Sequence, residues 1–107
     1  MMLVGDPLFL PEMSTILSYC SERRLPSVFS TDEWVIKGGL LSYEPQTKEM
    51  YRQTARYVVK ILRGAQPRNL PVEQPTRFWF AVNAKSARAL GLAIPLSLLQ
   101  RADQVIE

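Results

Sequence analysis

The chain has 107 residues, of which 47% are hydrophobic and 21% are charged, and its formal net charge is +3. This composition is typical of one globular domain and argues against intrinsic disorder. The chain has no histidine and only one cysteine, Cys20, which excludes an internal disulfide, a thiolate zinc cluster and the usual histidine base.

The N-terminal third alternates short apolar runs with one amphipathic segment. Residues 2–4 form a short apolar run that the turn Gly5-Asp6-Pro7 ends, which predicts a buried strand. The next segment has apolar residues at helical spacing and basic residues at its end, so we expect a helix over residues 11–24. Further strands are predicted over residues 28–30 and 40–43, with a polar loop over residues 31–33.

The clearest helix follows Pro45 and ends at Gly64, which suits a left-handed C-cap. Apolar residues recur along it at spacings of three and four: Tyr51, Thr54, Ala55, Val58, Ile61 and Leu62. Its other face carries five basic residues, Lys48, Arg52, Arg56, Lys60 and Arg63. They indicate either a phosphate-binding stripe or a solvated face with Glu49 paired to a neighbour; the pattern favours the solvated face. Residues 67–75 hold three prolines and predict a stiff connector.

The C-terminal third begins with an aromatic strand over residues 77–82. Asn83 is a good N-cap for a helix over residues 84–90, and Pro95 opens a last helical turn with Leu96, Leu99 and Ala102 inward. Helices between strands predict an α/β fold with a parallel, doubly wound sheet. Such sheets bind ligands beyond the carboxyl ends of their strands.

The chemistry-bearing residues do not form an enzyme site. Gly38-Gly39 lacks the spacing of a phosphate-binding loop. No histidine is available to activate a serine, and the neighbours Asp32 and Glu33 are more typical of a solvated loop than of an acid/base pair. We therefore expect a protein that is not an enzyme and has no cofactor or metal. The small positive charge is a weak indication of nucleic-acid binding, and we expect no such partner.

Several segments resemble a known family in the order in which they occur. Residues 38–43 read GGLLSY, residues 57–65 YVVKILRGA and residues 70–76 LPVEQPT, and similar matches continue over residues 83–92 and 101–107. Together they resemble the substrate-binding proteins of ABC transporters, a family that includes tryptophan- and tyrosine-type receptors. The resemblance covers nearly the whole chain.

This resemblance implies the C-terminal portion of a type I periplasmic-binding fold, in which a small ligand such as an amino acid lies between two α/β lobes. It places residues 1–39 in the second lobe, residues 40–66 in a strand-helix unit of first-lobe type, residues 67–76 in the returning crossover and residues 77–107 in the closing strand and helices. It also implies an ABC permease as partner and a periplasmic or extracytoplasmic location.

One residue departs from the family pattern. The family has a glycine after the Ser-Tyr pair, where this chain has Glu44. A residue with a Cβ adopts positive φ less readily than glycine does, so we expect an altered turn if the family needs that backbone shape.

The strand-end rule selects five candidate ligand-binding residues. Each follows or ends a predicted strand: Asp6, Ser30, Asp32, Tyr43 and Glu44. An aspartate suits a ligand ammonium group, and Tyr43 suits a flat or apolar body. For each of them a turn or capping role is the competing interpretation.

A free-standing, truncated protein without a transport role is the alternative. We expect no secretory signal at the N-terminus, because the first basic residues are Arg23 and Arg24, and a genuine short gene product would then be cytoplasmic. Without the missing lobe, the apolar face of residues 51–62 needs a cover, and we expect the isolated chain to form a homodimer or another oligomer through it.

Overall fold

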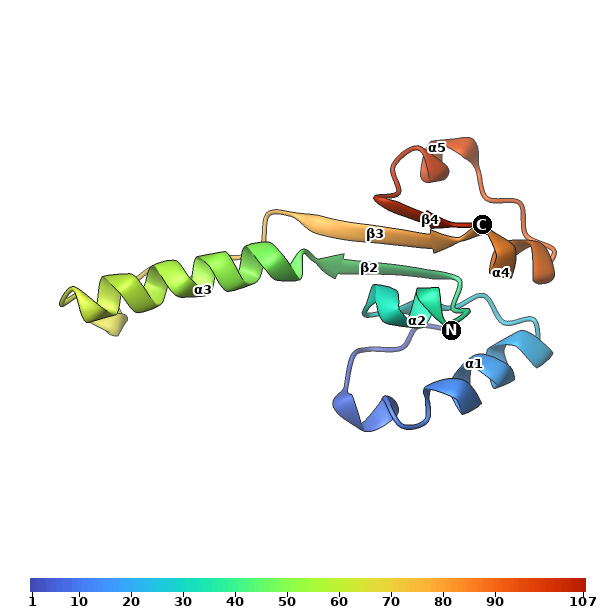
Figure 1. Cartoon of the computed structure of the whole chain (residues 1–107), viewed down its shortest axis with the longest axis horizontal. Helices are drawn as coiled ribbons and strands as arrows, with labels where there is room; N and C mark the ends of the chain where they lie inside the picture. The colour runs from blue at the N-terminus through green and yellow to red at the C-terminus, as the bar shows by residue number, and fades with distance from the viewer. The chain divides into compact units, whose positions relative to one another are not determined.

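The protein is described here by a computed structural model of residues 1–107, which fall into two compact units. Unit 1 comprises residues 1–44 and 79–107, and unit 2 comprises residues 45–78. The elements in chain order are η1 (Pro7–Phe9), α1 (Met13–Glu22), β1 (Val28–Phe29), α2 (Asp32–Ile36), β2 (Leu41–Pro45), α3 (Thr47–Leu62), η2 (Pro67–Asn69), β3 (Phe78–Asn83), α4 (Ala84–Ala89), α5 (Leu96–Leu99) and β4 (Gln104–Ile106) (Figure 1). None of these helices combines the length and the apolar character that crossing a membrane requires.

The four strands form one sheet in the order β1-β2-β3-β4. β1 is parallel to β2, and β3 is parallel to β4. β2 and β3 run in opposite directions (Figure 1), with backbone hydrogen bonds from Asn83 to Leu40 and from Gln46 to Arg77. The expected α/β fold is confirmed, and its sheet is mostly parallel; the antiparallel central pair is the difference from the parallel sheet that was predicted.

The core of unit 1 lies between the sheet and the two N-terminal helices. Met13, Phe29 and Trp34 form its centre, and the partly buried Leu3, Ile16 and Leu17 pack against them. The predicted apolar face of α1 is confirmed, because Met13 and Cys20, the first and last residues of that face, are buried. Burial raises the pKa of the Cys20 thiol, as expected for a packed core cysteine rather than a reactive one.

In unit 1, one prediction about local structure is wrong and one strand was not predicted. The expected polar loop over residues 31–33 includes the start of helix α2, whose buried Trp34 and Val35 hold it on the core. The C-terminal end forms strand β4, whose three residues are too few to show a periodic pattern in the sequence. Asp103 fixes the start of β4: its amide donates to the Phe80 carbonyl at 2.8 Å, and its Oδ2 accepts from the Phe80 amide at 2.8 Å.

The predicted first strand is shorter than expected. Met2 pairs with Val28 in a single parallel bridge, and the Leu3 amide donates to the Val28 carbonyl at 2.9 Å. The turn at Gly5 directs the following residues into η1 instead of extending the pairing. The N-terminal segment is therefore tied to β1 at one point, just before the residues expected to bind ligand.

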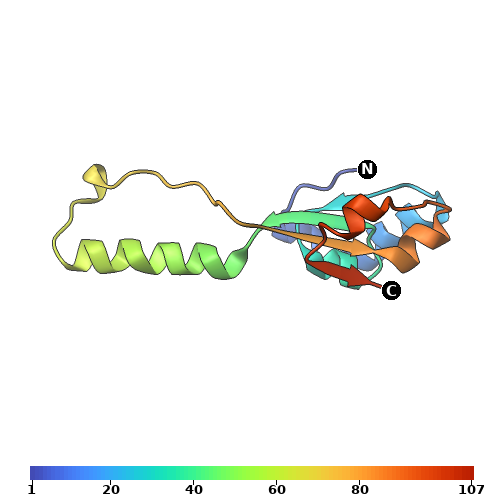
Figure 2. The same ribbon diagram turned by 90° about the horizontal axis from the view of Figure 1, so that it is seen from above.

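Unit 2 contains the long helix α3 and the connector that follows it (Figure 2). The Tyr57 hydroxyl donates to the carbonyl of Pro71, which ties the connector to the helix. Glu49 pairs with Arg52 at 3.6 Å, as the solvated-face interpretation predicted. No residue of α3 is buried, and its apolar side chains, among them Tyr51, Val58 and Leu62, are exposed.

Candidate functional site

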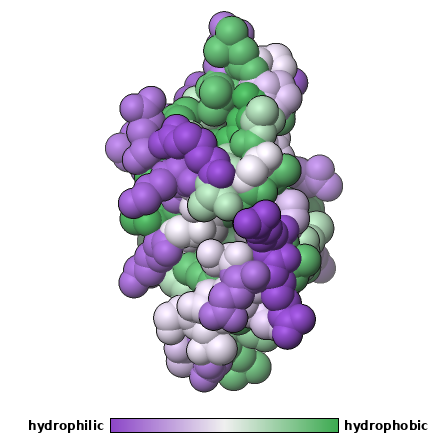
Figure 3. Space-filling model, turned by 90° about the vertical axis from the view of Figure 1, so that its right-hand side faces the viewer, coloured by the Kyte–Doolittle hydropathy of each residue, from purple (hydrophilic) through white to green (hydrophobic).

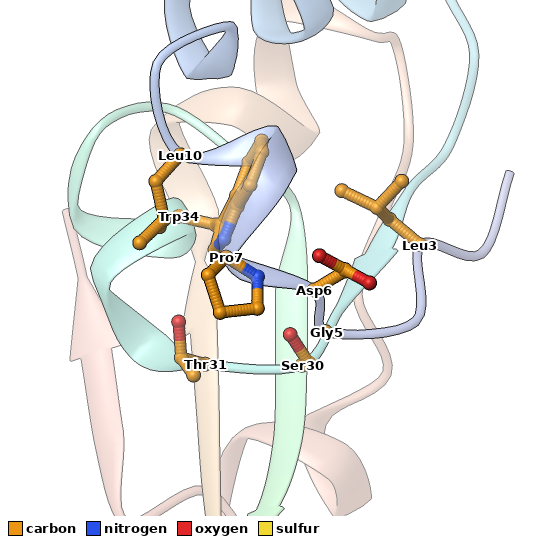
Figure 4. Close-up of a pocket in the computed structure, with 8 residues that line it drawn as sticks. All are labelled: Leu3, Gly5, Asp6, Pro7, Leu10, Ser30, Thr31 and Trp34. Atoms are coloured by element: carbon orange, nitrogen blue, oxygen red, sulfur yellow. The ribbon is translucent and has the colours of Figure 1, made fainter.

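A small cavity lies at the carboxyl ends of the first two strand segments of unit 1. Its volume is about 200 Å³, and its walls come from the N-terminal turn and from the loop that leads into α2. The lining residues are Leu3, Gly5, Asp6, Pro7, Leu10, Ser30, Thr31 and Trp34 (Figure 4). This is the position at which open α/β sheets bind their ligands.

The apolar wall of this cavity is built around Trp34. Its indole stacks on the ring of Phe29, with the centroids 4.9 Å apart and the planes 7° from parallel. Figure 4 shows the ring of Pro7 in front of the indole, with Leu10 beside them. Because Trp34 is almost fully buried, the cavity has a rigid apolar side against which a flat or aliphatic group can pack.

Asp6 supplies the charge of the cavity. Its Oδ1 accepts a hydrogen bond of 2.9 Å from the Leu8 amide, which caps η1 and fixes the carboxylate. Both interpretations of Asp6 that the sequence left open are therefore compatible with the structure. One oxygen forms the cap, and Oδ2 is left for a ligand donor.

The loop after β1 contributes two hydroxyl groups, from Ser30 and Thr31. Ser30 packs closely on the N-terminal turn, because a Cβ built on Gly5 would lie 2.6 Å from the Ser30 Oγ. Only glycine fits there without a shift. Thr31 is the N-cap residue of α2, but its hydroxyl makes no capping hydrogen bond.

Glu44 and Asp32 are brought together outside the cavity lining. The Asp32 amide donates to the Glu44 Oε1 at 2.8 Å, and this contact joins β2 to the start of α2. Burial raises the pKa of the Glu44 carboxyl; the nearby Asp32 carboxylate raises that pKa further, while the hydrogen bond from the Asp32 amide opposes the shift.

Tyr43 lies on the other face of β2 from Glu44. Its ring contacts Phe80 edge-on, with centroids 6.3 Å apart, and more than half of its surface is exposed. Among the five predicted residues, the structure places Asp6 and Ser30 in one cavity, Asp32 and Glu44 beside it, and Tyr43 on the opposite face. The lining roles of Trp34 and Thr31 were not predicted, although Trp34 stands only four residues beyond a strand end.

The arrangement suits binding rather than catalysis. Apolar groups form one side, and a carboxylate with two hydroxyls forms the other, so the cavity can hold a small molecule with an apolar body and a donor group. A volume of about 200 Å³ is below the range of roughly 300–1,000 Å³ that encloses most small ligands. The cavity can therefore serve as one wall of a larger site.

Unit 1 has other hollows besides this cavity. Figure 3 shows one side of the molecule, on which hydrophobic and hydrophilic residues are interspersed. A second hollow between α1 and α2 is larger, about 530 Å³, and Glu33 and Lys37 are among its lining residues. It lies away from the carboxyl ends of the strands, so the cavity at Asp6 is the stronger candidate.

The solved structures that this chain resembles include the following three. A conserved domain protein from Vibrio cholerae matches with a TM-score of 0.85 and 24% identity over 97% of this chain. A Streptococcus pneumonia protein in complex with L-Trp, described as an ABC domain, matches with a TM-score of 0.79 and 31% identity over 94%. CD0873, a substrate binding protein with adhesive properties from Clostridium difficile, matches in its ligand-free, open structure with a TM-score of 0.71 and 23% identity over 98%.

Each of these matches covers 35% of the solved chain, so this chain spans about a third of the length of those structures. A search of curated proteins found no match. A family model described as "ABC transporter substrate binding protein" matches residues 2–106, nearly the whole chain. The order of strands and helices, the cavity at the strand ends and this match agree, and the chain belongs to the ABC transporter substrate binding protein family.

Proposed function

We propose that the chain forms the C-terminal portion of a solute receptor that binds a small molecule such as an amino acid between two lobes. The match of the family over residues 2–106 carries this proposal, and the cavity at the strand ends supports it. The first wall of the site is the cavity around Asp6, Ser30 and Trp34. The second wall belongs to the two thirds of the fold that this chain does not span.

The chemistry of the cavity indicates the class of ligand. The carboxylate of Asp6 suits an ammonium group, because charge-assisted hydrogen bonds are the stronger ones. The indole of Trp34 and the ring of Pro7 suit an apolar side chain. An amino acid with an apolar or aromatic side chain combines both features, and a relative of 31% identity was solved with L-Trp.

Under this proposal the receptor delivers its ligand to an ABC permease and works outside the cytoplasm. Membership of a family of binding proteins supports this assignment and supports a role without catalysis. Asp32, Tyr43 and Glu44 lie outside the cavity lining, so direct contact between them and a ligand stays a prediction.

We expect the 107-residue chain alone to bind free amino acids only weakly, with dissociation constants in the roughly millimolar range. Ligand affinity depends on burial of most of the ligand surface, and a single wall leaves much of it in water. Isothermal titration with the free amino acids measures this. Submicromolar binding by the chain alone would contradict the two-wall proposal.

The same titration on a chimera tests the receptor function itself. In the chimera this chain replaces the matching third of the Streptococcus relative, so that both walls are present. We expect amino-acid binding to return in the chimera. A folded chimera that binds none of the free amino acids would overturn the proposed function.

In that chimera, Asp6→Ala should weaken amino-acid binding by about 1.5–3 kcal/mol if the carboxylate holds the ligand ammonium. Asp6→Asn is the matched control, because its amide oxygen still accepts from the Leu8 amide and so preserves the cap of η1. An equal loss of amino-acid affinity in both variants would show that the effect comes from the negative charge of Asp6. An Asp6→Asn variant with unchanged affinity would show that Asp6 is only a cap.

One observation favours a second property, self-association of the isolated chain. The apolar face of α3 is exposed, and apolar patches of more than a few hundred Å² are rare on soluble monomers. We propose that a second copy covers this face in a symmetric homodimer. This state would make the free-standing chain an oligomer-forming module, the alternative to a receptor portion.

A further inference from the structure

We propose that Glu44 is a positioning residue, whose carboxylate replaces the missing side-chain cap of α2 and so holds the ligand-binding loop in place. The proposal goes beyond the function above and rests on it only where it concerns the ligand. The evidence for it begins at the N-terminus of α2. Thr31 has the extended backbone of an N-cap residue, φ −141° and ψ 155°, but its side chain makes no capping hydrogen bond.

The first amide of α2 finds its acceptor elsewhere. The amide of Asp32 donates to the Glu44 Oε1 at 2.8 Å, across 12 positions of the chain. Helix N-termini leave their first amides without partners inside the helix, and a carboxylate is a favourable acceptor for them. Glu44 therefore supplies, from strand β2, an acceptor for the first amide of α2, whereas an N-cap serine or aspartate usually accepts from the second or third.

This contact fixes the segment that lines the cavity. Ser30 and Thr31 precede Asp32 directly, and Trp34 follows two residues later; all three line the cavity. The loop has little freedom on its other side, where Gly5 packs against Ser30. A displacement of the Asp32 amide would therefore move both hydroxyls and the indole relative to Asp6.

The tether uses a residue at which this chain departs from the family pattern that it resembles. The family segment that residues 38–43 resemble continues with glycine, which has no side chain to supply an acceptor. Glu44 lies within strand β2 and is not among the residues with positive φ, so the glutamate brings no backbone strain of that kind here; a turn altered relative to the family stays a prediction. What the glutamate adds is a carboxylate beside the start of α2.

The surroundings of Glu44 make this tether depend on pH. Asp32 on α2 brings a second carboxylate near it, Glu33 next to Asp32 is exposed, and Trp79, opposite on β3, does not titrate. Burial, aided by Asp32, raises the pKa of Glu44 above its ordinary value. A carboxyl whose pKa is raised by folding binds its proton more tightly in the folded state than in the unfolded state. The stabilisation that protonation gives to the folded chain is therefore present at low pH and is lost as pH rises through the folded pKa.

The test is a pH titration of the full chain by NMR, with Asp32→Asn recorded as well to separate the effect of its own carboxyl. We expect the Asp32 amide proton to shift with a midpoint above the ordinary pKa of glutamate, and this shift to vanish in Glu44→Gln. Replacement by the family residue, Glu44→Gly, should speed hydrogen exchange of that amide about tenfold or more, because hydrogen bonds to charged groups are among the stronger ones. Glu44→Gln retains an acceptor and should restore most of the protection.

Glu33→Gln is the matched control, because it removes a carboxylate one position along the same helix, and it should leave the titration and the exchange rate unchanged. As pH rises from about 4 to 7, the parent should lose stability relative to Glu44→Gln. An Asp32 amide whose shift and exchange do not respond to Glu44 would overturn the tether, whatever the chain binds. In the chimera, Glu44→Gly should weaken L-tryptophan binding several-fold with rescue by Glu44→Gln; a tether seen by NMR without this effect would overturn only its role for the ligand.

Discussion

Replacement of Trp34 by alanine is expected to lower the free energy of unfolding by about 3–5 kcal/mol, the range for large aromatic residues in a core. The side chain is 3% exposed, stacks on Phe29 and belongs to the cluster that joins α1 and α2 to the sheet. Truncation removes this stack and leaves a cavity in the core of unit 1. Urea denaturation followed by circular dichroism, at one fixed protein concentration, measures the loss.

Ile36→Ala on the same helix is the control for this experiment. Its side chain is 55% exposed, so the substitution should change the stability by no more than about 0.5 kcal/mol. A loss below about 1 kcal/mol for Trp34→Ala would mean that the cluster of Met13, Phe29 and Trp34 is not the core of unit 1.

The double substitution Val58→Lys and Leu62→Lys is expected to convert the isolated chain from a dimer to a monomer. These side chains are 49% and 80% exposed on the apolar face of α3, four residues apart, and therefore lie on one side of the helix. A symmetric interface would bring each new cation into contact with apolar groups or with its own copy, and both contacts oppose association. Sedimentation velocity at micromolar concentration measures the state.

Gln66→Lys adds a charge to unit 2 outside α3 and should leave the dimer intact. A parent chain that sediments as a monomer would contradict self-association. A dimer that survives the double substitution would place its interface elsewhere.

Sequence patterns predicted the longer helices and a local cap of this fold better than its shortest elements. The amphipathic period of α3, the N-cap at Asn83 and the apolar face of α1 each depend on residues close in sequence, and each is present. Asn83 caps α4 through the amide of Ser86, at 2.9 Å. The helix over residues 32–36 was missed because its polar first turn reads as a loop, and tertiary burial of Trp34 decides its conformation.

The candidate site could be predicted only in part for the same reason. The strand-end rule selected Asp6 and Ser30 because each stands at the end of a short apolar run. It gave no means of knowing that Glu44 would turn toward the backbone of Asp32, since that contact depends on how β2 lies beside α2. The direct neighbours of a strand end are visible in the sequence, whereas a partner supplied by another element requires the structure.

The paired hydrogen bonds between Asp103 and Phe80 have a consequence for the alignment of the edge strand. β4 has only three residues, and its side chains give little preference for one alignment over another. A slip by one position would break both hydrogen bonds of Asp103 and would turn the exposed Val105 to the face that Gln104 and Ile106 now occupy. One aspartate just before the strand thus fixes its register, so that a strand of only three residues pairs with β3 in a single alignment.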